Sequence, residues 1–108
     1  MTELNHPTID NAEVLRPTHI EIDLGAIAHN YRAISQHVNA RPIMAVVKAN
    51  AYGHGLVEVA RQLETLSVPQ FGVAFLEEGI RLRNAGITTP ILVMGGILGD
   101  QIPLFLEH

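Results

Sequence analysis

The sequence predicts an α/β fold with a parallel sheet, and more narrowly the front portion of a (β/α)8 barrel. Short continuous apolar segments, which are typical of strands buried on both faces, alternate with segments of helical period. The last helical segment stops early, and an open parallel sheet would leave an apolar edge that a closed barrel of about 250 residues removes. We therefore expect this chain of 108 residues to be the incomplete front of such a barrel.

The N-terminal part of the chain is predicted to hold a tail, a strand and a helix. Residues 1–16 show no clear period and are interpreted as a flexible tail. Polar and apolar residues alternate over residues 19–23, which is typical of a half-buried strand. This first strand either belongs to the barrel or pairs outside it. Asp23 occupies the N-cap position of a helix whose apolar face extends over residues 24–38 and which ends before Pro42.

Three βα units follow this helix. They cover residues 43–66, 70–86 and 90–108, with strands at 43–47, 70–75 and 91–94. Gly86 is the predicted left-handed stop of the middle helix, residues 77–85. Asp100 is the predicted cap of a last helix that begins near Gln101. Together, residues 17–108 are expected to form the truncated N-terminal portion of a single barrel domain.

Composition excludes several classes of function. The net charge of −4 gives no reason to expect nucleic acid or an anionic membrane as a partner. The absence of cysteine excludes a disulfide framework and a cysteine nucleophile, and the histidines lack the spacing of metal ligands. No apolar run approaches the roughly 20 residues that span a bilayer, and the N-terminus does not resemble a signal peptide. We therefore expect a cytoplasmic protein without a metal site.

Lys48 is the only lysine of the chain, and it directly follows the buried strand predicted at residues 43–47. In α/β folds ligands bind at this end of the strands, and a partly desolvated amine there is a good nucleophile. The alternative is a lysine whose head group reaches water from a strand end. Position alone favours this alternative, so the surrounding residues decide the interpretation.

The residues around Lys48 form a recognisable motif. Residues 45–55 read Ala-Val-Val-Lys-Ala-Asn-Ala-Tyr-Gly-His-Gly, which resembles the cofactor-lysine motif of the alanine racemases without a mismatch. The resemblance covers about residues 17–100 and departs at Thr18-His19, where an aromatic residue tends to stand in that family. Further matching segments are Glu-Ile-Asp-Leu at 21–24, Phe-Leu-Glu-Glu-Gly at 75–79, Leu-Arg-Asn-Ala-Gly at 82–86 and Pro-Ile-Leu-Val-Met-Gly at 90–95.

The resemblance implies an isomerase that interconverts L-alanine and D-alanine with pyridoxal 5'-phosphate, and so supplies D-alanine for peptidoglycan. It implies a (β/α)8 barrel followed by a mostly β domain, and a homodimer whose second base and main phosphate contacts lie beyond residue 108. A serine or broad-specificity racemase of the same fold is an alternative. A non-catalytic barrel that binds pyridoxal phosphate is another, although its lysine stands in a different sequence context. A fragment with no function of its own remains the third.

The resemblance also implies roles for five residues. Lys48 would bind the cofactor covalently and act as one of two bases, while the Tyr52 hydroxyl would reach the cofactor phosphate. The cofactor would be lined by Val46, Leu92 and Met94. Strand alternation puts Val46 and Lys48 on one side of their strand, and Leu92 and Met94 on one side of theirs. The alternatives are an aromatic at the rim for Tyr52 and barrel core for the three apolar residues. Met94 stands where leucine is usual, an exchange that nearly conserves volume.

Overall fold

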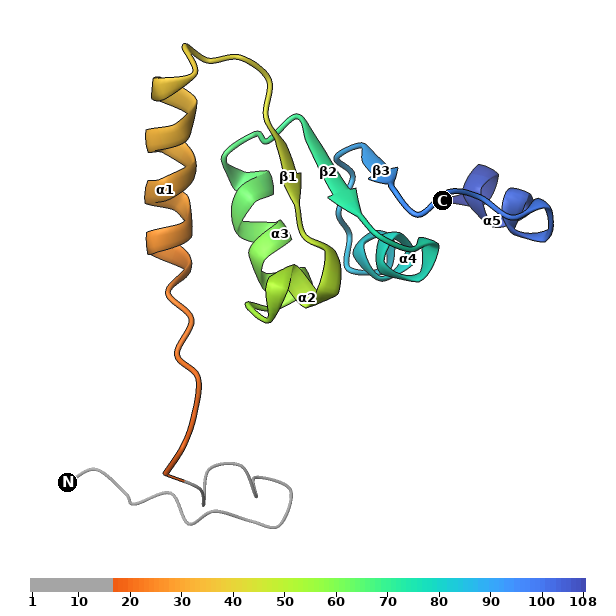
Figure 1. The fold of residues 1–108 in the computed structure, drawn as a ribbon, viewed down its shortest axis with the longest axis horizontal. Coiled ribbons are helices and arrows are strands. Elements are labelled where there is room, and N and C mark those ends of the chain that lie inside the picture. The colour runs from red at the N-terminus through yellow and green to blue at the C-terminus, as the bar shows by residue number, and fades with distance from the viewer. Residues whose placement is uncertain (1–16) are drawn as a thin grey trace.

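A short parallel sheet lies at the centre of the structure, a computed structural model that describes residues 17–108. Strands β1 (Met44–Val46), β2 (Gln70–Val73) and β3 (Ile91–Val93) are hydrogen-bonded in the order β1-β2-β3, and both pairs are parallel. The helices are α1 (Leu24–His37), α2 (Lys48–Tyr52), α3 (Leu56–Thr65), α4 (Leu76–Asn84) and α5 (Ile102–Glu107). The predicted α/β fold with a parallel sheet is confirmed (Figure 1).

Helix α1 begins where the sequence predicts. Asp23 has extended backbone angles, and its Oδ1 accepts a hydrogen bond of 3.0 Å from the Ala26 N–H. This bond satisfies one of the N–H groups that a helix start leaves without a partner. The helix lies beside α3, and Ala28 on its inner side is buried (Figure 1). The predicted N-cap is therefore confirmed.

The core is formed by one face of the sheet together with helices α3 and α4. Phe71 and Val73 of β2 are fully buried in it, in one cluster with Leu56 of α3 and Leu82 of α4. Burial of a side chain of this kind stabilises a fold by about 1.5–3 kcal/mol. Because successive strand residues point to opposite faces, Gly72 faces away from this core.

The other face of the sheet is apolar and remains uncovered by residues 17–108. Met44, Val46, Leu92 and Met94 lie on it with exposed fractions between 36% and 44%. A Cβ atom placed on Gly72 would lie 3.0 Å from Met44 Sδ and 3.5 Å from Met94 Cε. The Met44 and Met94 side chains therefore already occupy the space over Gly72, and a Cβ there would crowd Met44.

Two predicted features are wrong. Residues 19–23 form no strand but an irregular segment, with Ile20 81% exposed. A strand needs a neighbour that bonds its N–H and C=O groups, and the sheet of the described residues contains only β1, β2 and β3. Asp100 caps no helix, because it lies within the 3-10 turn Gly99–Gln101, and Gln101 itself precedes α5.

The other predicted bounds hold to within a residue or two. Gly86 has a φ of +89° and follows the end of α4, as predicted. The tail predicted for residues 1–16 lies outside the described residues. Over residues 17–108, no helix has both the length and the apolar character that crossing a bilayer requires.

Candidate functional site

Lys48 lies at the carboxyl end of β1, as the sequence predicts. The preceding residue, Val47, is 1% exposed, and its N–H donates a 2.8 Å hydrogen bond to the Gly72 carbonyl. The backbone therefore stays paired with β2 up to the residue before Lys48. Lys48 itself is half-buried. The only amine-bearing side chain of the chain thus follows a firmly held strand end.

The segment labelled α2 is a left-handed turn after Lys48 and not an ordinary α-helix. Residues Ala49, Asn50, Ala51 and Tyr52 have φ angles of +52°, +57°, +53° and +56°. This conformation costs an alanine or a tyrosine roughly 1–2 kcal/mol and an asparagine less, so the turn stores on the order of 3–6 kcal/mol. Backbone of this kind persists only where its surroundings hold it, and it is concentrated at functional sites. The sequence predicts a turn here, whereas the left-handed conformation of its backbone is seen only in the structure.

Hydrogen bonds and burial hold this turn. The Ala51 N–H donates to the Val47 carbonyl at 2.8 Å, and the Ala51 side chain is 5% exposed within the core. Asn50 Oδ1 accepts a 2.9 Å bond from the Leu56 N–H at the start of α3. A ring nitrogen of His54 lies 2.9 Å from the Ala51 carbonyl. The turn is therefore fastened at both ends.

Glu78 connects the turn to helix α4. Its Oε2 accepts a 2.8 Å hydrogen bond from the N–H of Ala49, the residue after Lys48. Its Oε1 accepts bonds of 2.8 Å from the Ala74 N–H and 3.0 Å from the Phe75 N–H. One carboxylate thus spans the carboxyl ends of β1 and β2. Sequence reasoning missed Glu78, although a glutamate at the third position of a helix is a known signal for bonding N–H groups at its start.

The structure brings three predicted cofactor residues together. Val46, Leu92 and Met94 share the uncovered face of the sheet, and Val46 and Leu92 lie opposite Gly72 in the register. Tyr52 stands at the end of the left-handed turn and is 59% exposed. The predicted placement of Leu92 and Met94 on one side of their strand is confirmed. The placement of Val46 with Lys48 and the role of these residues toward a cofactor stay predictions, because β1 ends at Val46.

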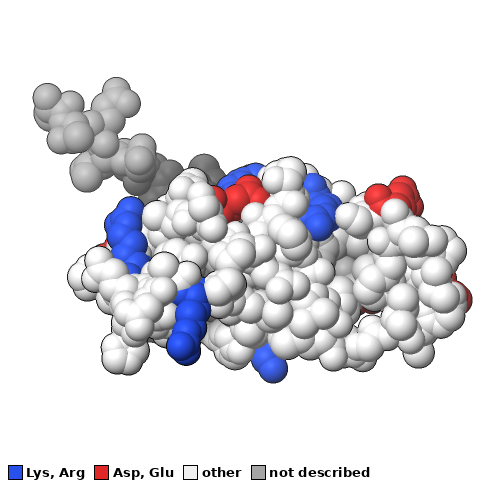
Figure 2. Space-filling model, turned by 90° about the horizontal axis from the view of Figure 1, so that it is seen from above, with Lys and Arg blue, Asp and Glu red and all other residues white. Residues whose placement is uncertain are grey.

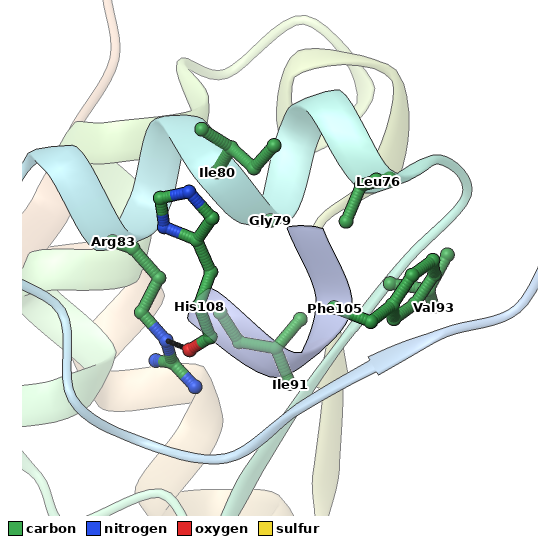
Figure 3. Close-up of a pocket in the computed structure, with 8 residues that line it drawn as sticks. All are labelled: Leu76, Gly79, Ile80, Arg83, Ile91, Val93, Phe105 and His108. Carbon is green, nitrogen blue, oxygen red and sulfur yellow. Dashed lines mark hydrogen bonds between the residues drawn. The ribbon is translucent and has the colours of Figure 1, made fainter. Parts of the chain in front are cut away.

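Cavities of different volume lie beside the turn after Lys48, between the loops after β2 and β3, and beside α4. One of about 890 Å³ lies beside the turn, with Asn50, Gly53 and His54 in its wall, and one of about 370 Å³ lies between the loops after β2 and β3. A third of about 80 Å³ lies between α4, β3 and α5, where Arg83 Nε donates a 3.0 Å bond to the His108 carbonyl (Figure 3). Ligand pockets have about 300–1,000 Å³, so the third is a packing gap.

Glu64 of α3 holds the loop before β3. Its Oε2 accepts hydrogen bonds from the Thr89 hydroxyl at 2.7 Å and from the N–H groups of Thr89 and Thr88 at 3.0 and 2.9 Å. The bond from the Thr89 hydroxyl is the largest cause that holds the pKa of this carboxyl below its ordinary value. The carboxylate therefore stabilises the loop that leads into β3.

Charged side chains are scattered over the face seen in Figure 2. Blue and red groups are interspersed on a mostly uncharged surface. For the described part of the chain, this face carries no continuous basic field of the kind that nucleic-acid-binding domains present.

Known proteins are similar to this chain in sequence and in fold. Residues 22–108 match the family model described as alanine racemase, N-terminal domain. A protein named alanine racemase from Geobacter sulfurreducens is 53% identical over 87 residues, which cover 80% of this chain and 23% of that protein. The crystal structure of alanine racemase from Bacillus anthracis with bound L-Ala-P is similar with a TM-score of 0.75 at 42% identity, over 80% of this chain and 22% of that one.

A histidine racemase from Leuconostoc mesenteroides is also similar, with a TM-score of 0.73 at 38% identity over 80% of this chain and 23% of that one. The chain therefore spans less than a quarter of the length of each of these three relatives.

Proposed function

The chain belongs to the alanine racemase N-terminal domain family, and from this premise we propose that it forms the front of an enzyme that interconverts L-alanine and D-alanine with pyridoxal 5'-phosphate. Its three-stranded parallel sheet with helices is consistent with the N-terminal part of a (β/α)8 barrel. The observation that carries the proposal is the position of Lys48. The single lysine stands at the carboxyl end of a parallel strand, where barrel enzymes hold their active sites.

The residues present fit the cofactor. A primary amine is the group that bonds an aldehyde, and Lys48 offers it at the edge of an apolar surface. The side chains of Met44, Val46 and Met94 lie around Gly72 and form an apolar surface there. A mostly apolar surface with few polar groups is the usual lining of a cofactor site. These features support the binding of a flat aromatic ring beside Lys48.

When bound, pyridoxal phosphate supplies an electron sink for the charge that develops at the substrate Cα. Lys48 Nζ would hold the cofactor, and the same amine would serve as the base that takes a proton from one face of the substrate Cα or returns one to it. The Tyr52 hydroxyl would donate a hydrogen bond to the phosphate. Val46, Leu92 and Met94 keep water from one side of the site, which strengthens the electrostatic interactions inside it. The base for the opposite face is assigned to residues outside this chain.

We assign the full-length enzyme to the cytoplasm, as a homodimer that supplies D-alanine for peptidoglycan. Family membership supports this assignment. A racemase for another amino acid is a second candidate, because the similar histidine racemase shares the fold at 38% identity. Substrate preference decides between the two candidates.

The proposal is tested first by chemical labelling. Borohydride reduction after incubation with pyridoxal phosphate leaves a stable pyridoxyl group on any amine that has bound the aldehyde. We expect the label on the peptide that contains Lys48, with the α-amine as the only other amine of this chain. Lys48→Arg removes the label, because the guanidinium stays protonated and is no usable nucleophile.

A matched control keeps one lysine in the chain. The double variant Lys48→Arg, Arg32→Lys moves the amine to an exposed position on α1. We expect it to label much more slowly than the unmodified protein. Equal labelling at position 32 would show that Lys48 is an ordinary surface amine, which contradicts the proposal.

Turnover is tested in the full-length enzyme by circular dichroism of L-alanine, L-serine and L-histidine. We expect fastest racemisation of L-alanine and none in Lys48→Arg. Preference for another amino acid would favour the second candidate. Normal turnover of Lys48→Arg, or labelling only at a lysine beyond residue 108, would exclude the role of Lys48.

A further inference from the structure

We infer that Glu78 is a positioning residue for Lys48. Its carboxylate ties the peptide bond that follows Lys48 to the start of α4, and so determines where the lysine backbone stands. The inference rests on the proposed function of Lys48. The resemblance assigns no role to Glu78, and sequence reasoning placed it only within a helix.

The bond from Ala49 acts directly on Lys48. The Ala49 N–H, bonded to Glu78 Oε2 at 2.8 Å, belongs to the planar peptide unit that also contains the Lys48 Cα and carbonyl. A hydrogen bond that holds this N–H therefore holds the orientation of the whole unit. The turn that follows is left-handed and strained, so its backbone needs such fixed contacts.

Helix capping explains only two of the three hydrogen bonds that Glu78 accepts. Oε1 alone bonds the Ala74 and Phe75 N–H groups at the start of α4. Oε2 reaches a residue 29 positions earlier in the chain, on a different strand end. Both oxygens act as acceptors, for three N–H donors in all. This requirement selects a carboxylate over an amide, because an amide offers only one acceptor atom.

The distinction between carboxylate and amide gives a selective variant. In Glu78→Gln the amide oxygen can keep Ala74 and Phe75, while the NH2 group then faces the Ala49 N–H as donor against donor. In the opposite orientation of the amide, the NH2 group would face the N–H groups of Ala74 and Phe75, which are two donors instead of one. Glu78→Gln should therefore release the turn after Lys48 and leave the start of α4 intact.

The matched control is Glu77→Gln, on the neighbouring exposed residue of α4. It removes the same charge from the same helix turn. Both variants are made in the full-length enzyme and compared by amide hydrogen exchange, by the rate of borohydride-trapped labelling of Lys48, and by kcat and KM.

For Glu78→Gln we expect the amide exchange rate of Ala49 to rise by at least about tenfold, because losing a hydrogen bond to a charged group changes an equilibrium by about this factor. The exchange rate of Ala74 should stay unchanged. Labelling of Lys48 slows, and kcat falls more than KM rises, because a displaced reacting group loses rate more than binding. Glu77→Gln changes none of these. If Glu78→Gln does not fold, Glu78→Asp keeps the charge but is too short to reach both strand ends, and the same exchange pattern is expected.

Two results would overturn the inference. One is Ala49 exchange in Glu78→Gln that equals exchange in Glu77→Gln. The other is raised exchange with an unchanged labelling rate and an unchanged kcat. Failure of the proposed function is distinguishable, because it appears as absence of label on Lys48 in the unmodified protein, while exchange at Ala49 still decides whether Glu78 holds the turn.

Discussion

Replacing Ala49 by glycine should stabilise the protein or leave its stability unchanged, although the same exchange destabilises an ordinary helix. Ala49 is exposed and has a φ of +52°, a conformation that costs an alanine roughly 1–2 kcal/mol and a glycine almost nothing. Glycine also gives the unfolded chain more freedom, which destabilises by about 0.4–1 kcal/mol. The expected net change lies between about 0 and 1.5 kcal/mol in favour of the folded state.

Ala33→Gly is the matched control. Ala33 is exposed in the right-handed helix α1, where glycine costs about 1 kcal/mol relative to alanine. The two variants should therefore differ in free energy of unfolding by roughly 1–2.5 kcal/mol, with opposite tendencies. The backbone N–H of residue 49 is present in both residue types, so the bond to Glu78 is retained.

Urea unfolding followed by far-ultraviolet circular dichroism measures the difference from the two midpoints at a common slope. A loss of stability in Ala49→Gly as large as in Ala33→Gly would refute the reasoning, because it would mean that residue 49 does not hold a left-handed conformation in solution.

Two further predictions concern the loops on either side of the sheet. The lowered pKa of Glu64 means that its carboxylate stabilises the fold above the ordinary value of 4.5 and that this contribution disappears as the pH falls below it. Glu64→Gln should therefore unfold at lower temperature at neutral pH and show a weaker decline toward about pH 3; an acid decline as steep as in the unmodified protein would contradict this. Gly95→Ala should destabilise by about 1–3 kcal/mol, because its Cβ would meet the Ala74 carbonyl oxygen, a backbone atom that cannot move aside. Gly99→Ala is the control, with no atom within 4 Å of the new Cβ, and equal midpoints in urea for both variants would count against the packing argument.

The elements that the sequence predicts well are those whose signals are local. The N-cap at Asp23 and the stop at Gly86 depend on side chains and backbone within one helix turn. The apolar runs likewise predict the three strands, although one face of their sheet is uncovered within residues 17–108. Lys48 could be placed at a strand end on the same grounds, while the roles that its motif implies for the surrounding residues stay predictions.

The features that escaped prediction depend on distant partners. Residues 19–23 have the alternation of a strand, but no strand of the described sheet bonds them. The left-handed turn contains two alanines and a tyrosine, which do not favour this conformation by themselves. Burial of Ala51 in the core and the bond from Ala49 to Glu78 select it, and the latter joins residues 29 positions apart. No local pattern carries that information.

The strand order β1-β2-β3 has a consequence for the way the chain folds as it is made. A ribosome releases a protein from its N-terminus, and here each new strand finds its neighbour already present and adds at the same edge of the sheet. Each addition closes a loop of one βα unit only, so the entropy of loop closure stays small at every step. Within residues 17–108, the edge of β3 is therefore the last edge of the sheet to form during synthesis, and exposed backbone of this kind is a template for strand pairing.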